Sequence, residues 1–209
     1  MADYNDKSAI KGLDKSEMYS KLIGFPNQVR DAFSHLSDIK LPSLRNDAYA
    51  NIIIAGMGGS AIGGDFVRAL LLDESTIPVF VVRDYSLPRF VSKDSLVIAV
   101  SYSGNTEEVI AAYREARKRG SICVVVSCGG ELSSIARNEK VPLITVKEGF
   151  HPREAVGYLL LSIYHILGET RLFSIRLEDS EMLGSFLEQS GLKLVSEVSE
   201  GENSAKFIA

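Results

Sequence analysis

Five short runs rich in Val and Ile, separated by segments with helical periodicity, constrain the fold of this chain more than any other feature. The runs are Ile52–Ala55, Val79–Arg83, Leu96–Val100, Ile122–Ser127 and Leu143–Val146. The helical segments between and after them are Ser60–Leu72, Asn105–Arg119, Glu131–Asn138 and Pro152–Leu167. Continuous apolar strands that alternate with helices are typical of a parallel sheet covered on both faces. The sequence therefore predicts an α/β fold with a five-stranded parallel sheet between two layers of helices.

The regions outside this alternation are expected to be helical appendages. Two helical segments, Lys15–Ile23 and Pro26–Leu36, precede the first strand. After Leu172 the pattern predicts an amphipathic helix over Leu177–Val195, a polar linker over Val198–Asn203 and the start of an apolar run at Ala205. We expect an N-terminal helical segment (1–45) packed on an α/β domain (46–172), followed by a helix and linker (173–209). A chain of 209 residues, 45% of them hydrophobic, is long enough for one substantial core.

Charge and cysteine content exclude several classes of protein. The net charge of -4 argues against a nucleic-acid-binding surface. Met1–Leu13 lacks the apolar core of a signal peptide, and no stretch approaches the roughly 20 apolar residues of a membrane span. A cytoplasmic protein without membrane contact is therefore expected. Cys123 and Cys128 lack the spacing and neighbours of a metal or redox site, so they are predicted to be buried free thiols.

Hydroxyl side chains follow the third predicted strand, at the point where a helix is expected to begin. The sequence there is Ser101-Tyr-Ser-Gly-Asn-Thr106. The free N–H groups and positive dipole end of a helix attract anions, and short hydroxyl side chains donate hydrogen bonds to phosphate oxygens. We therefore predict that Ser101, Ser103 and Thr106 bind a phosphate group. An ordinary strand-to-helix turn is the alternative, but it would need only a capping residue and a glycine.

The helix after this turn carries its own signals. Asn105 is expected to cap it and Glu108 to complete a capping box, with Gly120 ending it. Glu107 and Glu108 suit the helix dipole but would repel a phosphate. Phosphate binding thus requires that their carboxylates point away from the site.

A glycine-rich turn follows the first predicted strand, in Gly56-Met-Gly-Gly-Ser-Ala61. It matches the G-x-G-x-x-A pattern of dinucleotide-binding proteins, with Asp84 as a conceivable ribose ligand. Bare backbone at Gly58 and Gly59, followed by Ser60, also suits a sugar or phosphate. The hydroxyl-rich loop has no place in the dinucleotide pattern, so the two loops together favour a phosphorylated small molecule over NAD.

A third group of polar residues follows the fifth predicted strand. Pro152 is expected in the first turn of a helix, which would place His151, Arg153 and Glu154 at the same carboxyl edge of the sheet as the other two loops. Arg153 can bind sugar oxygens or stabilise an enolate-type anion. A solvated arginine is the alternative, although a cation is unfavourable in a first helical turn. His151 and Glu154 can equally have structural roles, and His35 and His165 are predicted to be structural.

Together these motifs resemble those of sugar isomerase (SIS) domains, and more narrowly those of the archaeal-type bifunctional phosphoglucose/phosphomannose isomerases. The resemblance rests on four segments: Leu13–Tyr19, Gly56-Met-Gly-Gly-Ser60, Ser101-Tyr-Ser-Gly-Asn-Thr-Glu-Glu108 and Pro152-Arg-Glu-Ala155. It implies a SIS domain with a flavodoxin-like three-layer αβα fold. It also implies that the sugar contacts Gly58, Gly59 and Ser60, that the phosphate contacts Ser101, Ser103 and Thr106, and that Arg153 stabilises an enediolate intermediate.

The resemblance further implies an aldose–ketose isomerisation of glucose 6-phosphate or mannose 6-phosphate to fructose 6-phosphate, by a homodimer and without metal or cofactor. Members of that family have two SIS domains, and the catalytic glutamate, a histidine from across the dimer and a lysine belong to the second. Glu202–Ala209 resembles the segment that leads into the second domain. We therefore expect this chain to be the N-terminal, phosphosugar-binding half, inactive or weakly active alone, in which Glu202 is not the catalytic base.

Two other classes of function remain open at this point. A single SIS domain can act as a non-catalytic phosphosugar-binding module. A sensor that regulates transcription would carry a basic helix-turn-helix, whereas residues 1–50 offer two short helices and no basic cluster. The other class is a dinucleotide-dependent enzyme, which titration with NADH would test.

Overall fold

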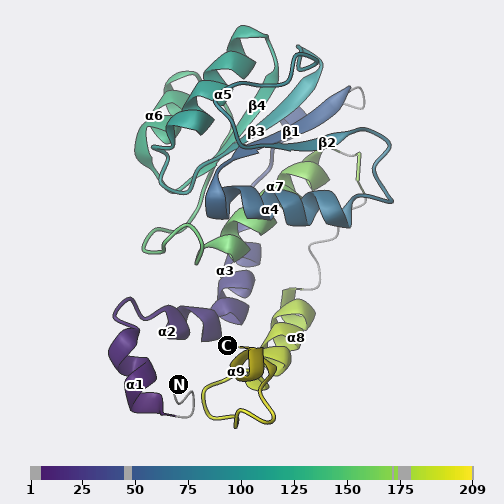
Figure 1. The fold of residues 1–209 in the computed structure, drawn as a ribbon. Coiled ribbons are helices and arrows are strands. Elements are labelled where there is room, and N and C mark those ends of the chain that lie inside the picture. Colours follow the sequence, from purple (N-terminus) through teal and green to yellow (C-terminus); the bar gives the residue numbers. More distant parts are fainter. Residues whose placement is uncertain (1–5, 45–48, 171, 174–179, 209) are drawn as a thin grey trace. The chain divides into compact units, whose positions relative to one another are not determined.

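The computed structural model describes residues 6–44, 49–170, 172–173 and 180–208. The chain divides into two compact units (Figure 1). One is formed by Met1–Asp31 and Glu178–Ala209, and the other by Ala32–Leu177. The second unit contains the sheet and all three loops singled out by the sequence.

The sheet has five parallel strands in the order β2-β1-β3-β4-β5. The strands are β1 (Asn51–Gly56), β2 (Val79–Val82), β3 (Ser95–Val100), β4 (Ile122–Ser127) and β5 (Leu143–Thr145). Ala55 of β1 pairs with Ala99 of β3, so these two strands end level with each other. The predicted parallel sheet is confirmed, and each predicted strand agrees with the observed one to within one residue at either end. The turns that follow β1 and β3 therefore leave the sheet side by side.

Helices cover both faces of the sheet, as the sequence predicts. Those that follow the strands are α4 (Gly58–Leu70), α5 (Glu107–Lys118), α6 (Gly130–Asn138) and α7 (Val156–Glu169). Figure 1 shows α4 and α7 on one face and α5 and α6 on the other. Helix α3 (Phe25–Ser37) crosses from the first unit into the second, where the short 3-10 helix η1 (Pro42–Leu44) follows it.

The sheet separates the core into two parts, because successive side chains of a strand point to opposite faces. Those on one face, such as Ile53 and Val97, pack against the apolar faces of α5 and α6. On the other face the helix α4 comes very close to its neighbours, because a Cβ atom at Gly64 would lie 2.8 Å from Cγ2 of Ile54 and one at Gly63 would lie 3.2 Å from the backbone N of Leu160. These two glycines allow α4 to pack against both the sheet and α7.

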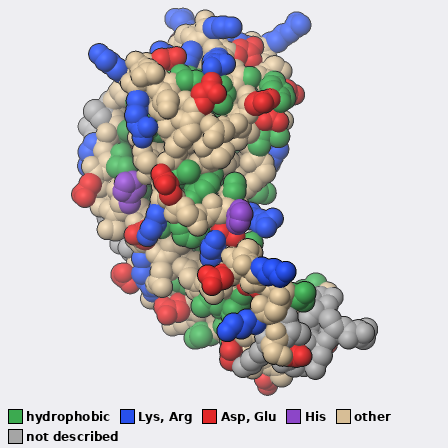
Figure 2. Space-filling view, turned by 90° about the vertical axis from the view of Figure 1, so that its left-hand side faces the viewer, with side chains coloured by type: hydrophobic (Ala, Val, Ile, Leu, Met, Phe, Trp, Pro, Cys, Tyr) green, Lys and Arg blue, Asp and Glu red, His purple; other side chains and the backbone are tan. Residues whose placement is uncertain are grey.

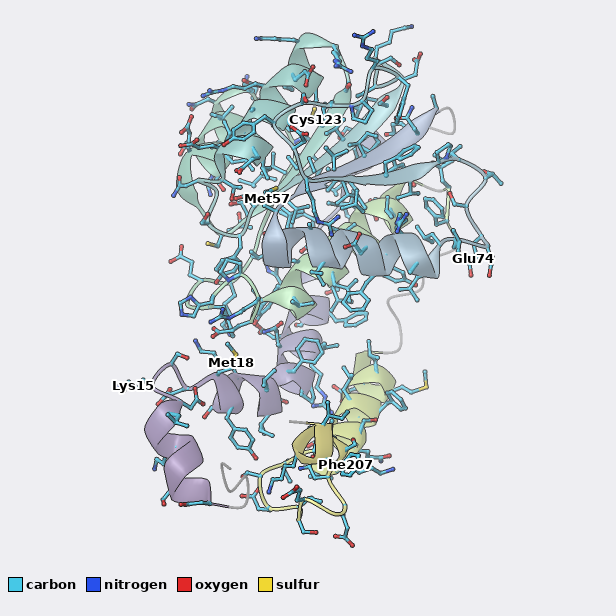
Figure 3. All side chains as sticks on the ribbon, in the orientation of Figure 1. Lys15, Met18, Met57, Glu74, Cys123 and Phe207 are labelled. Atoms are coloured by element: carbon cyan, nitrogen blue, oxygen red, sulfur yellow. The ribbon has the colours of Figure 1, made fainter. Side chains whose placement is uncertain are left out.

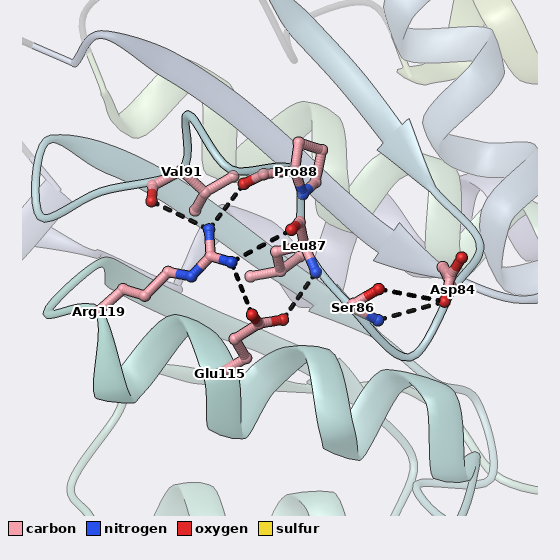
Figure 4. Close-up of polar contacts among 7 residues, drawn as sticks. All are labelled: Asp84, Ser86, Leu87, Pro88, Val91, Glu115 and Arg119. Carbon is pink, nitrogen blue, oxygen red and sulfur yellow. Dashed lines mark hydrogen bonds and ion pairs between the residues drawn. The ribbon is translucent and has the colours of Figure 1, made fainter.

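The segment between β2 and β3 is held to α5 by two side chains (Figure 4). Arg119 donates hydrogen bonds to the carbonyl oxygens of Leu87 at 3.2 Å and of Pro88 at 2.6 Å, and it also contacts the carboxylate of Glu115. Glu115 in turn accepts a hydrogen bond from the backbone N–H of Leu87 at 2.7 Å. The N–H of Leu87 and the guanidinium of Arg119 together lower the pKa of the Glu115 carboxyl group.

The first unit consists of helices joined by side-chain hydrogen bonds. Its helices are α1 (Lys7–Leu13), α2 (Met18–Ile23), α8 (Ser180–Leu192), α9 (Ser204–Ile208) and the start of α3. The carboxylate of Asp14 accepts hydrogen bonds from the N–H groups of Met18 and Tyr19, both at 2.8 Å, which fixes the start of α2. The Tyr19 hydroxyl accepts one from the N–H of Ser196 at 2.7 Å. Lys15, Met18 and Phe207 mark this unit in Figure 3.

Helix boundaries are where the predictions differ from the structure. Helix α1 was not expected, and α2 begins three residues after the predicted start because Asp14 stabilises a turn before it. The helix predicted over Leu177–Val195 is confirmed from Ser180 to Leu192, while residues 177–179 lie outside the described residues. None of the helices in the described part of the chain combines the length and the hydrophobicity that crossing a membrane requires.

Candidate functional site

The serine loop, which we define as residues 101–106, joins β3 to α5. The side chain of Ser101 is buried, and its Oγ lies 2.8 Å from Oγ1 of Thr106 and accepts a hydrogen bond from the N–H of Gly104 at 3.1 Å. Gly104 has a φ of 70°, a conformation that residues with a side chain rarely adopt. Ser103 is exposed, and its Oγ accepts a hydrogen bond from the N–H of Asn105 at 3.3 Å. Ser103 is thus exposed, whereas the half-buried Thr106 has its hydroxyl against that of the buried Ser101.

Asn105 has a different role from the predicted one. Helix α5 begins at Glu107 with Thr106 as its N-cap residue, and no side-chain capping bond is formed there. Oδ1 of Asn105 instead accepts a hydrogen bond from the N–H of Glu131 at 3.0 Å, at the start of α6. The predicted cap and capping box of α5 are therefore wrong, because Asn105 is already bonded to the neighbouring helix. The first N–H groups of α5 have no partner within the helix.

The serine loop also packs tightly against the turn between β4 and α6. A Cβ atom on Gly104 would collide with the carbonyl oxygen of Gly129, and one on Gly130 would collide with that of Ser103. The N–H of Leu132 donates to the carbonyl oxygen of Gly104 at 2.9 Å. Two glycine positions thus allow these two turns to lie directly against each other, which sequence reasoning did not identify.

The glycine loop, residues 57–60, joins β1 to α4. Met57, labelled in Figure 3, is the N-cap residue of α4, and Gly58 follows it with a φ of 49°. Ser60 is buried, and its Oγ accepts a hydrogen bond from the N–H of Tyr102 at 3.2 Å. This bond joins the glycine loop to the serine loop. The helix begins two residues before the predicted start at Ser60, so Gly58 and Gly59 belong to its first turn.

The arginine loop, residues 147–155, joins β5 to α7. Helix α7 begins at Val156, so the prediction that Pro152 lies in its first turn is wrong. Residues 151–155 form a separate turn in which the N–H of Glu154 donates to the carbonyl oxygen of His151 at 2.8 Å. The carboxylate of Glu154, which is buried, accepts a hydrogen bond from the N–H of His151 at 2.9 Å. The side chains of His151 and Arg153 are exposed.

The arginine loop touches the glycine loop at its backbone. A Cβ atom on Gly59 would lie 2.7 Å from the carbonyl oxygen of Pro152 and 2.8 Å from the N atom of Arg153. With the bond between Ser60 and Tyr102, this contact brings all three loops together at the carboxyl edge of the sheet. The sequence-predicted residues therefore lie on loops that meet at this edge: Gly58, Gly59, Ser60, Ser101, Ser103, Thr106 and Arg153.

Other charged and polar groups near these loops have ordinary partners. Glu108 and Glu107 raise the pKa of Tyr85, so the two carboxylates lie near the segment that follows β2. Asp84, considered above as a ribose ligand, accepts hydrogen bonds from Ser86 in the same turn (Figure 4). Basic and acidic side chains are interspersed over the face shown in Figure 2.

Two histidines contact backbone carbonyl groups, and the two cysteines are free thiols. Nε2 of His35 and Nε2 of His165 each contact a backbone carbonyl oxygen at 2.9 Å, those of Thr145 and Ile39. Cys123 is a buried free thiol, as predicted, whereas Cys128 is partly exposed. In the residues that the structure describes, no three His, Cys, Asp or Glu side chains gather as they would around a metal ion.

Comparison with known proteins agrees with this arrangement. The family model of the SIS domain matches residues 46–156, which include β1 to β5 and all three loops. The chain belongs to the SIS domain family. Its α/β fold also matches that of a solved structure: the tagatose-6-phosphate ketose/aldose isomerase from Escherichia coli has a TM-score of 0.61 and 17% identity, over 83% of this chain and 53% of that one.

Several curated relatives of this SIS protein carry the name bifunctional phosphoglucose/phosphomannose isomerase. The one from Caldicellulosiruptor bescii is 35% identical over 194 residues, which are 91% of this chain and 56% of the relative. The one from Thermoplasma acidophilum is 45% identical over 121 residues, or 58% of this chain and 37% of the relative. The chain therefore spans about half the length of the first of these relatives and less of the second.

Proposed function

We propose that this SIS protein binds a phosphorylated sugar and is the phosphosugar-binding part of an isomerase that interconverts glucose 6-phosphate or mannose 6-phosphate with fructose 6-phosphate. The observation that carries this proposal is the meeting of the serine, glycine and arginine loops at one edge of the sheet. The names of the curated relatives support the reaction.

The phosphate end of the site is proposed to be the serine loop. Ser103 is exposed and Thr106 is half-buried at the start of α5, where N–H groups without a partner within the helix and the helix dipole favour an anion. Ser101 is buried, so it contributes by holding Thr106 and the N–H of Gly104 in place. The approach of Gly104 to Gly129 supports a rigid loop, which binds an anion without first becoming ordered.

The sugar end is proposed to lie between the glycine and arginine loops. Gly58 is exposed and leaves the backbone accessible to the sugar, while Gly59 allows the close approach of the arginine loop. Ser60 follows them. Isomerisation moves a proton between C1 and C2 through an enediolate, whose negative charge Arg153 would stabilise. In the described residues of these loops the buried acid Glu154 is bonded to the N–H of His151, which gives it a structural role. We propose that the base comes from outside this chain.

Isothermal calorimetry with fructose 6-phosphate and with inorganic phosphate tests the binding site. Replacing Ser103 by Ala should weaken both affinities by about 1 to 3 kcal/mol, because a hydrogen bond to a charged group is lost. Ser37→Ala removes another exposed hydroxyl, one that bonds to the carbonyl oxygen of Ser34 on α3, and should leave binding unchanged. Equal affinities of wild type and the double variant Ser101→Ala/Ser103→Ala would exclude the serine loop from the site.

A homodimer and a cytoplasmic location complete the proposal. Along α4 the side chains of Ile62, Phe66 and Leu70 are 41%, 53% and 62% exposed and are spaced to form one stripe on the helix, which supports burial against a second copy. Light scattering should give a dimer that Phe66→Asp dissociates. A wild-type monomer at micromolar concentration would contradict the homodimer.

The free thiols Cys123 and Cys128 suit a reducing compartment, which supports the cytoplasmic location.

A further inference from the structure

Tyr102 is the second residue of the serine loop, but its side chain extends from that loop to the arginine loop. Its hydroxyl donates a hydrogen bond to the carbonyl oxygen of Lys147 at 2.8 Å and accepts one from the N–H of Phe150 at 3.0 Å. The residue is only 5% exposed. Burial raises the pKa of the phenol, so the hydroxyl stays protonated and keeps both bonds at neutral pH.

The backbone of Tyr102 joins the two remaining loops. Its N–H donates to Oγ of Ser60 at 3.2 Å, and its carbonyl oxygen accepts a hydrogen bond from the N–H of Cys128 at 2.9 Å. This one residue therefore contacts the turns that follow β1, β4 and β5 as well as belonging to the turn after β3. A shift of Tyr102 would therefore disturb its hydrogen bonds to both other loops of the candidate site.

The bonds of the Tyr102 hydroxyl fix the turn that immediately precedes Arg153. Lys147 and Phe150 are the two ends of that turn, and Gly149 within it has a φ of 95°. In the next turn, the carboxylate of Glu154 accepts a hydrogen bond from the N–H of His151. Gly59 packs against the backbone of Arg153 from the other side. The backbone of Arg153 is thus enclosed by contacts that start from Tyr102 and from the glycine loop.

We propose that Tyr102 is a positioning residue that holds Arg153 at the sugar end of the site, in register with the phosphate bound by the serine loop. This inference rests on the proposed function, because it assigns the phosphate to the serine loop and the enediolate to Arg153. Phosphate and enediolate are parts of one molecule at a fixed separation, so the two loops must keep a fixed separation too. A phenol that belongs to one loop and bonds to the other sets that separation.

The test compares two ligands in the full 209-residue chain. Inorganic phosphate occupies the serine loop alone, whereas 5-phosphoarabinonate carries a carboxylate in place of the enediolate and also reaches Arg153. Tyr102→Phe keeps the ring and removes the two hydrogen bonds. It should weaken binding of 5-phosphoarabinonate about fivefold to tenfold, the scale of one ordinary hydrogen bond, and leave inorganic phosphate within about twofold.

A double variant separates positioning from a general structural effect. If Tyr102 acts through Arg153, then Tyr102→Phe should cause no further loss in a chain that already carries Arg153→Ala. Tyr113→Phe is the matched control, because Tyr113 is also a buried tyrosine whose hydroxyl donates a hydrogen bond, here to Glu139 at the C-terminal end of α6. It should change neither affinity.

A readout without ligand completes the test. Amide hydrogen exchange in residues 147–155 should be faster in Tyr102→Phe than in wild type and unchanged in Tyr113→Phe. Equal losses for both ligands, additive losses in the double variant, or unchanged exchange in residues 147–155 would each overturn the inference. A wild-type chain that binds neither ligand would refute the proposed function, and the inference with it; binding of both ligands without any discrimination by Tyr102→Phe would refute the inference alone.

Discussion

Gly104 and Gly129 touch each other, yet they should respond in opposite ways to an added methyl group. At Gly104 a Cβ atom would collide with the carbonyl oxygen of Gly129, and the φ of 70° is unfavourable for any L-residue. At Gly129 the same atom would meet nothing within 4 Å. We expect Gly104→Ala to lower the free energy of unfolding by about 2 to 4 kcal/mol, and Gly129→Ala by less than about 0.5 kcal/mol.

Urea unfolding of the two variants measures this difference directly. Because the collision lies inside the serine loop, Gly104→Ala should also weaken phosphate binding under conditions where the protein remains folded. If both substitutions had the same small effect, the close packing of the serine loop against the turn before α6 would be wrong.

The two thiols should differ in reactivity. Burial raises the pKa of Cys123 to about 12, so at neutral pH almost none of it is thiolate, the form that reacts. Cys128 is partly exposed at the carboxyl end of β4. With a thiol reagent such as dithionitrobenzoate, the folded chain should show one faster-reacting thiol, absent in Cys128→Ser, and a second that reacts only after denaturation. Rapid reaction of both thiols in the folded protein would contradict the burial of Cys123.

Among the elements, the contact between α5 and the segment after β2 should depend on pH. The Leu87 N–H and Arg119 hold the pKa of Glu115 below its ordinary value of 4.5 in the folded chain. A carboxyl group with a lowered folded pKa stabilises the folded state above its unfolded pKa, and this stabilisation is lost as the pH falls through the folded value. The free energy of unfolding should therefore decrease as the pH is lowered below about 4.5.

The variant Glu115→Gln identifies the contribution of this carboxyl group. Chemical unfolding at about pH 6 and about pH 3 should show a smaller difference in stability for Glu115→Gln than for wild type. Glu131→Gln is the control, because the ion pair of Glu131 with Arg114 is exposed and such pairs contribute little. If Glu115→Gln kept the full pH dependence of the wild type, that pH dependence would have to come from other groups.

The strands were predictable because their signal is local, whereas the helix starts were not. Val and Ile runs such as Leu96–Val100 are typical of strands in a parallel sheet, and parallel strands place their carboxyl ends at one edge. The start of α5 depends on Asn105, which could cap its own helix by sequence but bonds to Glu131 in the fold. The start of α7 depends on a turn closed by Glu154.

Only part of the candidate site could be predicted from the sequence. Its residues could be selected by topology and residue type, because the hydroxyls and glycines after β1 and β3 and the arginine after β5 lie at the same edge of a parallel sheet. The linkage between the loops could not be predicted, since the bonds of Tyr102 to Lys147 and Phe150 join residues more than forty positions apart. Nor does the sequence show that Ser101 is buried beneath Thr106.

For the whole molecule, we expect binding without efficient turnover. Enzymes lower reaction barriers by at least roughly 8 kcal/mol, and a phosphate-binding loop with one arginine does not supply this without a base. A coupled assay of glucose 6-phosphate isomerisation with residues 1–209 should therefore give little or no activity. A form extended to the full length of the curated relatives should be active, and Arg153→Ala should abolish that activity whereas Arg137→Ala, on α6, should not. Family-typical turnover by the 209-residue chain would make Glu154 or Glu202 the next base to test.

The strand β1 lies between two strands that are both translated after it. In the finished sheet all six of its residues are buried, and its neighbours are β2 and β3. Parallel strands cannot pair through a short hairpin, so a growing chain carries Asn51–Gly56 without its full partners until Ser95–Val100 has left the ribosome. An apolar strand in that state can associate with other chains. The time needed to synthesise the chain from β1 to β3 therefore determines how long β1 of each new molecule can associate with other chains.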